Sequence, residues 1–321
     1  MALFLVTGGA GFIGSAVVQK LRVRGERVRV VDNVATGQRK NLHGVLSDAD
    51  FYEGDIAELD VCHQVMQGVD YVLHQAALPS VPRSLHDPLA THRSNVTGTV
   101  NLLVAAREAK VKRFVIASSS SIYGNTPTLP KVETMPPAPL SPYAVSKLAA
   151  EQYALVFFKV FGQETVALRY FNIFGPRQDP NSPYSGVLSR FITALLRGKR
   201  PTIYGDGLQS RDFTYVDNAV QANLLACEAP HAAGKVFNIA TGARHTLMET
   251  LAMMSEIIGV RAEPCFASPR PGEVRHSQAD IRLAQEVLGY RPTVGFREGL
   301  EKTIAWYREN MTAVVNLAKG D

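Results

Sequence analysis

A glycine-rich loop near the amino end constrains the fold of this chain more than any other feature. An apolar run at residues 3–6 is followed by Gly8, Gly11 and Gly14 at three-residue spacing, and residues 13–21 then carry apolar side chains with a helical period. In such a loop the first glycine permits a tight turn, the second lets the backbone approach a pyrophosphate, and the third allows close helix–strand packing. The pattern predicts a strand–turn–helix unit that binds a dinucleotide at a helix N-terminus.

The second apolar run identifies the dinucleotide. Residues 27–31 end at Asp32, about twenty residues beyond the loop, where an acidic side chain would bind ribose hydroxyls. Because a carboxylate there would repel a 2′-phosphate, we expect NAD rather than NADP. Arg39 and Lys40 follow closely and keep NADP open as the alternative, although a solvated loop is the favoured interpretation of these two residues.

Alternation of strand-like and helical segments indicates the fold class. Further strand-like runs occur at residues 51–52, 71–74, 114–117 and 165–170. With helical stretches between them, they predict an α/β fold, a Rossmann-type doubly wound parallel sheet. Loops rich in proline and glycine follow residue 175. We therefore predict an NAD-binding domain over residues 1–175 and a smaller mixed α/β substrate-binding domain over residues 176–321.

The second domain is expected to mix short strands with helices. Its candidate strands are residues 201–204 and 213–216, and its candidate helices are residues 280–288 and 296–310. A strand near residues 236–240 is a candidate to return to the first domain. Ligands of doubly wound sheets bind in the crevice at the carboxyl ends of the strands, so we expect the second domain to cover that crevice.

Composition narrows the class of partner. The formal net charge is +5, but the positive residues are scattered, so we expect an anionic small molecule and no nucleic acid. No apolar span reaches about twenty residues, which predicts no membrane partner. Cys62, Cys227 and Cys265 are odd in number and widely spaced, which suits neither a disulfide framework nor a metal site. We therefore predict no metal and a reducing, cytoplasmic location.

Tyr143 and Lys147 supply the candidate chemistry. Four residues apart on a helix, their side chains project from one face. A free tyrosine has a pKa of roughly 10, and a nearby cation lowers that pKa by stabilising the phenolate. The pair therefore predicts a base that takes a proton from a substrate hydroxyl. By itself this spacing is also that of an ordinary pair on a helix surface.

Several motifs in register resemble a known family. They are TGGAGFIG, the strand ending at Asp32, GDI at residues 54–56, QAA at residues 75–77, SSSSIYG and YAVSK. Together they resemble the extended short-chain dehydrogenases/reductases. RYFNIFGPRQDP, IYGDGLQSRDFTYVDNAVQANLLA and RPGEVRHSQADI extend the resemblance over nearly the whole chain, and it is closest to the UDP-hexose and UDP-N-acetylhexosamine 4-epimerases.

The resemblance implies a set of NAD-binding residues. They are Gly8, Gly11, Phe12, Ile13, Gly14, Asp32, Asn33, Thr36, Gly37, Asp55, Ile56, Gln75, Ala76, Ala77, Tyr143, Lys147 and Tyr170. Asp55 and Ile56 are expected to hold the adenine, with a helix cap as the alternative role of Asp55. The loop at residues 33–37 would lie along the adenosine ribose, and residues 76–77 would line the cofactor.

It also implies the catalytic residues. Tyr143 becomes the base, and Lys147 tunes it and binds the nicotinamide ribose. Ser119 falls at the family's catalytic serine or threonine, with Ser120 beside it. Because the run at residues 118–121 is all serine, its register stays open by one residue.

The implied substrate site involves residues from both halves of the chain. Its members are Ser80, Ser119, Ser120, Tyr143, Asn172, Tyr204, Arg211, Arg270, Glu273 and Ser277. On the resemblance, Asn172 contacts the diphosphate-sugar, Tyr204 stacks on the uracil, Arg211 and Arg270 grip the diphosphate, and Glu273 binds a ribose hydroxyl. Guanidinium groups suit the diphosphate because they form paired, charge-assisted hydrogen bonds.

The implied activity is NAD-dependent 4-epimerisation of UDP-sugars through a transient 4-keto sugar. A 4,6-dehydratase would need an acid pair after the catalytic serine, where Ser120 and Ser121 stand. A UDP-glucuronate 4-epimerase remains an alternative, although we locate no residue set for the sugar carboxylate. A catalytically silent NAD-sensing protein is disfavoured because Tyr143, Lys147 and the serine occur together.

Two finer expectations concern the sugar and the assembly. Ser277 falls where the family carries a residue walling the C2 side of the sugar, and a small side chain there should admit an N-acetyl group. Pro79 stands where a lysine is common, and Ser80 beside it faces the sugar on this resemblance. Two predicted helices, residues 96–110 and 143–161, are apolar on more than one face, which predicts a homodimer. The residues concerned are Val145, Leu148, Val156, Phe157 and Phe161.

Overall fold

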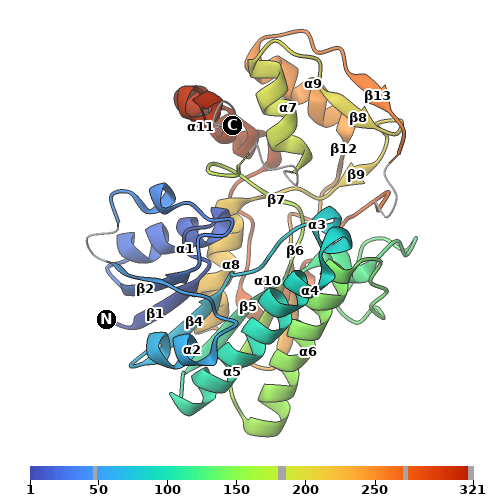
Figure 1. Cartoon of the computed structure of the whole chain (residues 1–321). Helices are drawn as coiled ribbons and strands as arrows, with labels where there is room; N and C mark the ends of the chain where they lie inside the picture. The colour runs from blue at the N-terminus through green and yellow to red at the C-terminus, as the bar shows by residue number, and fades with distance from the viewer. Residues whose placement is uncertain (46–48, 180–185, 270–273, 317–321) are drawn as a thin grey trace.

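A seven-stranded sheet forms the centre of the computed structural model (Figure 1), which describes residues 1–45, 49–179, 186–269 and 274–316. Its strands are β1 (Leu3–Thr7), β2 (Arg27–Asp32), β3 (Ala49–Glu53), β4 (Tyr71–His74), β5 (Arg113–Ser119), β6 (Thr165–Tyr170) and β11 (Lys235–Ile239). Their order is β11-β6-β5-β4-β1-β2-β3, and every neighbouring pair is parallel. From β1 the chain adds strands toward one edge of the sheet up to β3, and from β4 onward it adds them toward the other edge. The strand order therefore reverses between β1 and β4, which is where doubly wound sheets bind their ligands.

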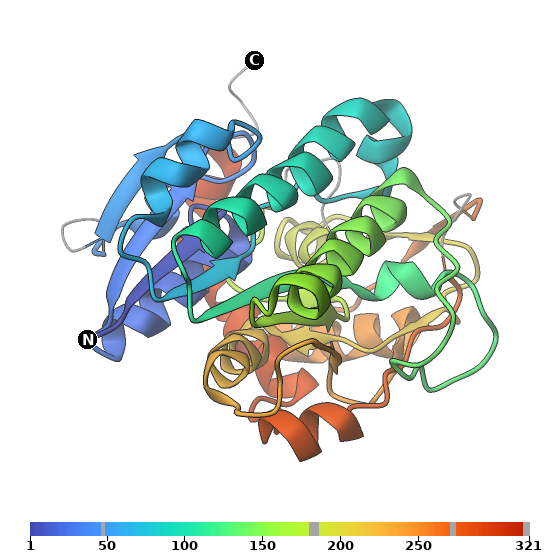
Figure 2. The ribbon, with the colours of Figure 1, turned by 90° about the horizontal axis from the view of Figure 1, so that it is seen from below.

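Helices cover both faces of this sheet (Figure 2). One face carries α1 (Phe12–Val23), α8 (Val216–Glu228) and α10 (Arg282–Leu288); the other carries α2 (Leu59–Met66), α5 (Gly98–Glu108) and α6 (Pro142–Phe161). Two buried apolar clusters result, one on each side of the sheet. Because the sheet is covered on both faces, its strands read as continuous apolar runs, as β1 does. The predicted doubly wound α/β fold is confirmed.

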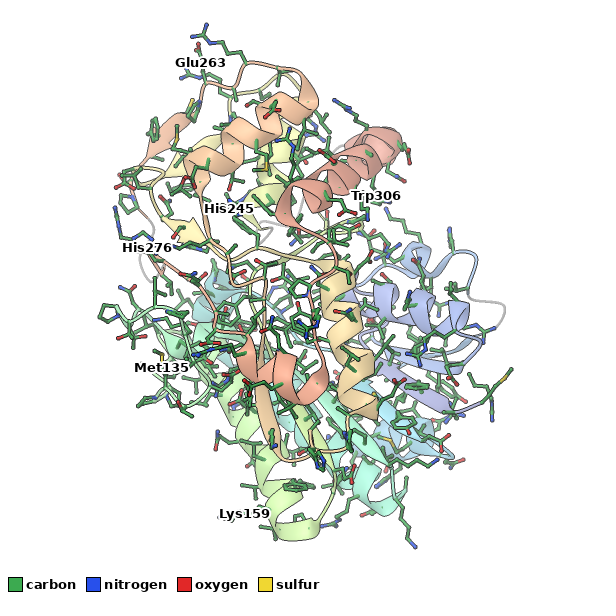
Figure 3. The ribbon with its side chains drawn as sticks, turned by 180° about the vertical axis from the view of Figure 1, so that it is seen from behind. Met135, Lys159, His245, Glu263, His276 and Trp306 are labelled. Carbon is green, nitrogen blue, oxygen red and sulfur yellow. The ribbon has the colours of Figure 1, made fainter. Side chains whose placement is uncertain are left out.

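A smaller lobe lies above the carboxyl edge of the sheet. Its helices are α7 (Val187–Leu196), α9 (Leu247–Ile258) and α11 (Phe296–Asn316), and its strand pairs are β8 (Thr202–Tyr204) with β13 (Cys265–Ala267) and β9 (Ser210–Arg211) with β12 (His245–Thr246). In Figure 3 this lobe carries His245, His276 and Trp306, whereas Lys159 of α6 lies at the opposite end of the molecule.

The chain crosses between the two parts more than once. A short parallel pair, β7 (Ile173–Phe174) and β10 (Thr214–Tyr215), joins the segments that leave and re-enter the sheet region. β11 then runs beside β6, over the residues where the sequence places a candidate returning strand. Since α8, β11 and α10 pack with the main sheet, the second lobe is smaller than residues 176–321.

One buried carboxylate ties these crossings together. Asp212 accepts hydrogen bonds from the backbone N–H groups of Thr241, Gly242 and Ala279 and from the Thr241 hydroxyl, at 2.8–3.2 Å. Burial raises its pKa to about 6, against the opposing effect of these bonds. The carboxylate thereby holds the segment after β9 to the turn after β11 and to the chain before α10.

Helix α6 has well-defined ends that follow from its sequence. The Ser141 hydroxyl accepts from the N–H of Ala144 at 3.2 Å, Pro142 occupies the first turn, and Gly162 ends the helix in the left-handed conformation. The other predicted dimer helix, residues 96–110, is observed as α5 with its first two residues in a π-helical turn at Arg93–Thr97. No helix among the described residues is long and apolar enough to cross a membrane.

Candidate active site

A cavity of about 1080 Å³ opens at the carboxyl edge of the sheet, beneath the smaller lobe. This volume lies at the upper end of the range for small-molecule sites, about 300–1,000 Å³. Every predicted site residue that the structure describes lines it: Gly8, Gly11, Phe12, Ile13, Gly14, Asp32, Asn33, Thr36, Gly37, Asp55, Ile56, Gln75, Ala76, Ala77, Ser80, Ser119, Ser120, Tyr143, Lys147, Tyr170, Asn172, Tyr204, Arg211 and Ser277. Arg270 and Glu273 lie outside the described residues.

The glycine loop forms a cradle that side chains would fill. Gly8 has a φ of +67°, and a Cβ there would lie 2.7 Å from the backbone N of Ala76. A Cβ on Gly14 would lie 2.1 Å from the carbonyl oxygen of Gly8, so helix α1 can pack against the loop only without it. A Cβ on Gly11 would meet only that same oxygen, at 3.1 Å. The loop therefore fits the pyrophosphate of a dinucleotide at the N-terminus of α1.

Asp32 is held firmly at the end of β2. Its Oδ2 accepts from the N–H of Ala10 at 2.9 Å and its Oδ1 from the N–H of Val34 at 2.8 Å. Burial raises the Asp32 pKa, and these two bonds oppose that shift. Arg39, the alternative partner for a 2′-phosphate, forms an ion pair with Glu53 at 2.7 Å. The fixed carboxylate of Asp32 and the pairing of Arg39 with Glu53 both suit ribose hydroxyls better than a 2′-phosphate.

The carboxylate of Asp55 is already partly engaged. Its Oδ1 accepts from the N–H of Ala57 at 2.9 Å, and its Oδ2 pairs with Arg93 at 2.7 Å. Asp55 thus stabilises the turn that leads into α2, while it also lines the cavity. Glu58, rather than Asp55, precedes the first residue of that helix.

A buried histidine organises the end of β4. Thr99 donates to the carbonyl of Asn95 at 2.6 Å, so its oxygen accepts the Nε2–H of His74 at 2.9 Å. The Nδ1 of His74 then accepts the hydroxyl of Thr7 at 2.7 Å, and the oxygen of Thr7 accepts the N–H of Ala76. Burial lowers the His74 pKa to about 3, so the ring is neutral. This network fixes one wall of the cavity.

Gln75 and Tyr170 belong to a second buried network. The Tyr170 hydroxyl donates to Gln75 Oε1 at 3.1 Å and accepts from Asn223 Nδ2 at 2.6 Å, while Gln75 Nε2 donates to Asn223 Oδ1. Burial raises the Tyr170 pKa to about 12. Tyr170 is therefore a neutral phenol that orients Gln75 at the floor of the cavity.

Tyr143 and Lys147 lie one turn apart on α6, deep in the cavity. Burial raises the Tyr143 pKa, and a side-chain hydrogen bond with Ser119 opposes that shift. Burial also lowers the Lys147 pKa to about 8, and its Nζ donates to the carbonyl of Ala117 at 2.9 Å. The Tyr143 pKa of the chain by itself is thus raised, opposite in direction to the lowered pKa expected from the sequence, because burial desolvates the phenolate.

The serine run has distinct environments at successive positions. Ser118 is buried and donates to Glu151 at 2.7 Å, and it also lines the cavity. Ser119 accepts from the N–H and hydroxyl of Ser121, and its side chain acts to lower the Tyr143 pKa. Ser120 starts a short 3-10 turn and also lines the cavity. The geometry thus favours Ser119 as the partner of Tyr143.

Of the residues predicted to bind substrate, Asn172 and Ser277 contact each other, and Arg211 and Ser80 line the same cavity. Asn172 has a φ of +40°, and its Nδ2 donates to the carbonyl of Asp212 at 2.9 Å and to the Ser277 hydroxyl at 3.1 Å. The Arg211 guanidinium donates to the carbonyls of Ser210 and Arg275. Ser80 has a φ of +108°, a strained conformation for a residue with a side chain, and caps α3 (Val81–His86).

The cavity also contains residues that the sequence analysis did not single out. They include Arg83, Lys131, Gln178, Asp179, Leu188 and Arg190. Gln178 and Asp179 belong to the RYFNIFGPRQDP motif, although no role was expected for them, and Lys131 has no signal because a buried lysine resembles a surface one in sequence. Across the described residues, no three His, Cys, Asp or Glu side chains are grouped as metal ligands.

Comparisons with known proteins agree with this geometry. Residues 4–240 match the NAD dependent epimerase/dehydratase family. A UDP-glucose 4-epimerase from Thermotoga maritima, solved with UDP-glucose, is 39% identical with a TM-score of 0.92, covering 96% of this chain and 99% of its own. A UDP-N-acetylglucosamine 4-epimerase from Methanobrevibacter ruminantium, in complex with UDP-N-acetylmuramic acid, is 37% identical with a TM-score of 0.92, covering 97% and 99%.

A third solved structure carries the cofactor. It is a UDP-glucuronic acid 4-epimerase from Bacillus cereus in complex with UDP-glucuronic acid and NAD. Its identity is 35% and its TM-score 0.89, and the match covers 96% of this chain and 99% of the other. Since three proteins with different sugars are about equally similar, overall likeness does not select the sugar.

Gly11→Ala tests the cradle. A Cβ at Gly11 would make one tight contact within the protein, at 3.1 Å from the Gly8 carbonyl oxygen, and would project where the pyrophosphate is expected, so we expect a folded protein whose NAD affinity falls at least about tenfold. Gly295→Ala is the control, because its Cβ would meet nothing within 4 Å. NAD released on denaturation and the melting temperature are measured for both. Unchanged NAD content in Gly11→Ala would place the cofactor phosphates elsewhere.

Proposed function

Because the chain belongs to the NAD dependent epimerase/dehydratase family, we propose that it is a 4-epimerase of UDP-hexoses that also accepts their N-acetylated forms. It is an NAD-dependent isomerase with a function like that of UDP-glucose 4-epimerases. We propose the choice among UDP-sugars and the role of each residue on the evidence that follows.

One observation carries this proposal. Tyr143 is half-buried, Ser119 acts to lower its pKa, Lys147 lies one turn away, and all three line the cavity that contains the glycine loop and Asp32. A proton acceptor and a dinucleotide site therefore open into one space. Such an arrangement suits proton removal from a sugar hydroxyl next to a hydride acceptor.

The residues of the chain divide the work of the reaction. Bound NAD supplies a nicotinamide ring that takes up a hydride and returns it. The Tyr143 oxygen takes the proton of the O4 hydroxyl and gives it back, and Ser119 holds the reacting oxygen beside it. Because burial alone raises the Tyr143 pKa, the phenolate needs the positive charge of Lys147. Arg211 is proposed to hold the diphosphate while the sugar turns.

Tyr143→Phe removes the base and keeps the shape of the ring. We expect turnover to fall by about a thousandfold or more, with NAD content close to that of the unmodified protein. Tyr153→Phe is the matched control, because Tyr153 is an exposed tyrosine of the same helix. Epimer ratios are followed by NMR with UDP-Gal, UDP-GalNAc and UDP-GlcA. Near-normal turnover by Tyr143→Phe would contradict the mechanism.

Acceptance of N-acetylated sugars is inferred from Ser277. Its side chain is small and buried, its hydroxyl accepts a hydrogen bond from Asn172, and it lines the cavity. A small wall at this point leaves space for an acetamido group at C2, whereas a ring would fill that space. A small side chain at this point admits plain hexoses as well as their N-acetylated forms, so UDP-Glc and UDP-Gal are also proposed as substrates.

Ser277→Tyr tests this wall. We expect UDP-GalNAc turnover to fall by at least about a hundredfold while UDP-Gal turnover changes little, because only the acetamido group overlaps with the ring. Ser277→Ala is the control for the lost hydroxyl and should keep both activities. If Ser277→Tyr affects both substrates equally, the wall of the C2 pocket is formed by other residues.

A homodimer is also proposed, through the outer face of α6. Val145, Val156 and Phe161 are 52%, 47% and 49% exposed, an unusual density of apolar side chains for a solvent-facing helix. Leu148 packs against the core and Phe157 is buried, so these two contribute to the fold of one chain.

All three cysteines are free thiols, which supports the proposed cytoplasmic location.

Light scattering measures the assembly. We expect a mass of twice the 35.0 kDa of one chain at micromolar concentration. Val156→Glu should reduce that mass toward one chain, since a carboxylate would lose its water in an apolar interface. Lys159→Glu, a charge change on the same helix, is the control. A monomer for the unmodified protein would exclude the dimer.

A further inference from the structure

A fully buried ion pair lies directly behind the serine run. Glu151 of α6 and Arg169 of β6 are both buried, and the guanidinium donates to the two carboxylate oxygens at 2.9 and 2.7 Å. Desolvation of two buried charges cancels much of their attraction, so such a pair contributes little to stability compared with apolar packing. Its position next to the active site points to a role other than stability.

The carboxylate of this pair holds the start of the serine segment, residues 118–123. Ser118 donates to Glu151 Oε2 at 2.7 Å and lies directly opposite Arg169 in the pairing of β5 with β6. The preceding residue, Ala117, is held by Lys147 of the same helix at 2.9 Å. Two successive residues of β5 are thus fixed to α6 immediately before Ser119.

The guanidinium holds the other end of the same segment. Arg169 Nη1 donates to the Tyr123 hydroxyl at 2.7 Å, and that hydroxyl donates in turn to Asn238 Oδ1 at 2.7 Å. Between the two ends, Ser119 and Ser121 close a short turn through the N–H and hydroxyl of Ser121. One ion pair therefore contacts both ends of the segment that carries the proposed catalytic serine.

Helix α6 carries Glu151 of this ion pair as well as the proposed reacting groups. Tyr143, Lys147 and Glu151 follow one another at four-residue spacing on α6, so they share one face of the helix. The proposed base, Tyr143, is at the first of these positions, and Glu151 of the ion pair is at the third. A shift of the serine segment relative to α6 would therefore change the distance between Ser119 and Tyr143.

We propose that Glu151 and Arg169 are positioning residues that clamp the serine segment at Ser118 and Tyr123 and thereby align Ser119 with Tyr143. The proposal rests on the proposed epimerase function for its kinetic consequences. Its structural part, the alignment of Ser119 with Tyr143, is measurable without any sugar through the Tyr143 pKa.

Two hydroxyl deletions release the clamp without removing a charge. Ser118→Ala and Tyr123→Phe each break one end, and both leave the Glu151–Arg169 pair in place. The controls remove comparable buried hydroxyls remote from the serine segment. Thr165→Val removes the bond from β6 to the Ala154 carbonyl of α6, and Tyr290→Phe removes a phenol that donates to Ala240.

The first readout is the Tyr143 pKa, from ultraviolet tyrosinate spectra of each NAD-loaded protein minus those of its Tyr143→Phe counterpart. Because the Ser119 bond lowers this pKa, releasing the segment should raise it. The second readout is kcat against pH. Its rise should move to higher pH, and kcat near neutral pH should fall about tenfold while KM changes less than about threefold.

Both controls should lose similar thermal stability and keep the Tyr143 pKa and kcat of the unmodified protein. The proposal is overturned if Ser118→Ala and Tyr123→Phe behave as the controls do. Absence of epimerisation by the unmodified protein would reject the proposed function alone, because the Tyr143 pKa still decides the positioning role.

Glu151→Gln tests the charge of the clamp. It keeps the shape of the side chain but leaves the buried Arg169 without a counter-charge, so we expect a larger fall in kcat than in either hydroxyl variant. A folded Glu151→Gln protein with unchanged kcat and Tyr143 pKa would overturn the role of the pair. If this variant does not fold, the two hydroxyl deletions decide.

Discussion

Close contact between the first turn of the chain and the end of β4 is the constraint on which the cavity depends. Gly8 lies so near Ala76 that a Cβ would fall 2.7 Å from its backbone nitrogen, and Gly14 packs equally closely on Gly8. These contacts let α1 start at the edge of the sheet, at the place where the strand order reverses. The crevice therefore has one wall of backbone, and the N–H groups and dipole of α1 would face the phosphates of a dinucleotide bound there.

Burial then acts on the chemistry within that crevice. It raises the pKa of Tyr143 and lowers that of Lys147 to about 8, because an apolar environment disfavours both charged forms. The pKa values of the two groups, which are nearly equal in water, are thereby moved apart, and the neutral form of each group is favoured. A cationic cofactor beside them would favour the phenolate, which links proton transfer to a loaded site.

Polar networks under the cavity hold its walls in place. The neutral His74 network orders the end of β4, and the Gln75–Tyr170–Asn223 network orders its floor. The Glu151–Arg169 pair does the same for the serine segment. Satisfied buried networks fix one arrangement because every alternative leaves a polar group without a partner.

Local patterns in the sequence determined the parallel sheet, the dinucleotide loop, Asp32, and the ends of α6, because each depends on residues close together in the chain. Tertiary structure alone gave the four identical serines distinct environments, since their sequence carries no difference until Ser118 of β5 donates to Glu151 of α6. It also decided the direction of the Tyr143 pKa, the pairing of Asp55 with Arg93, and the contact between Asn172 and Ser277. These properties depend on burial and on partners distant in sequence, which spacing along the chain does not encode.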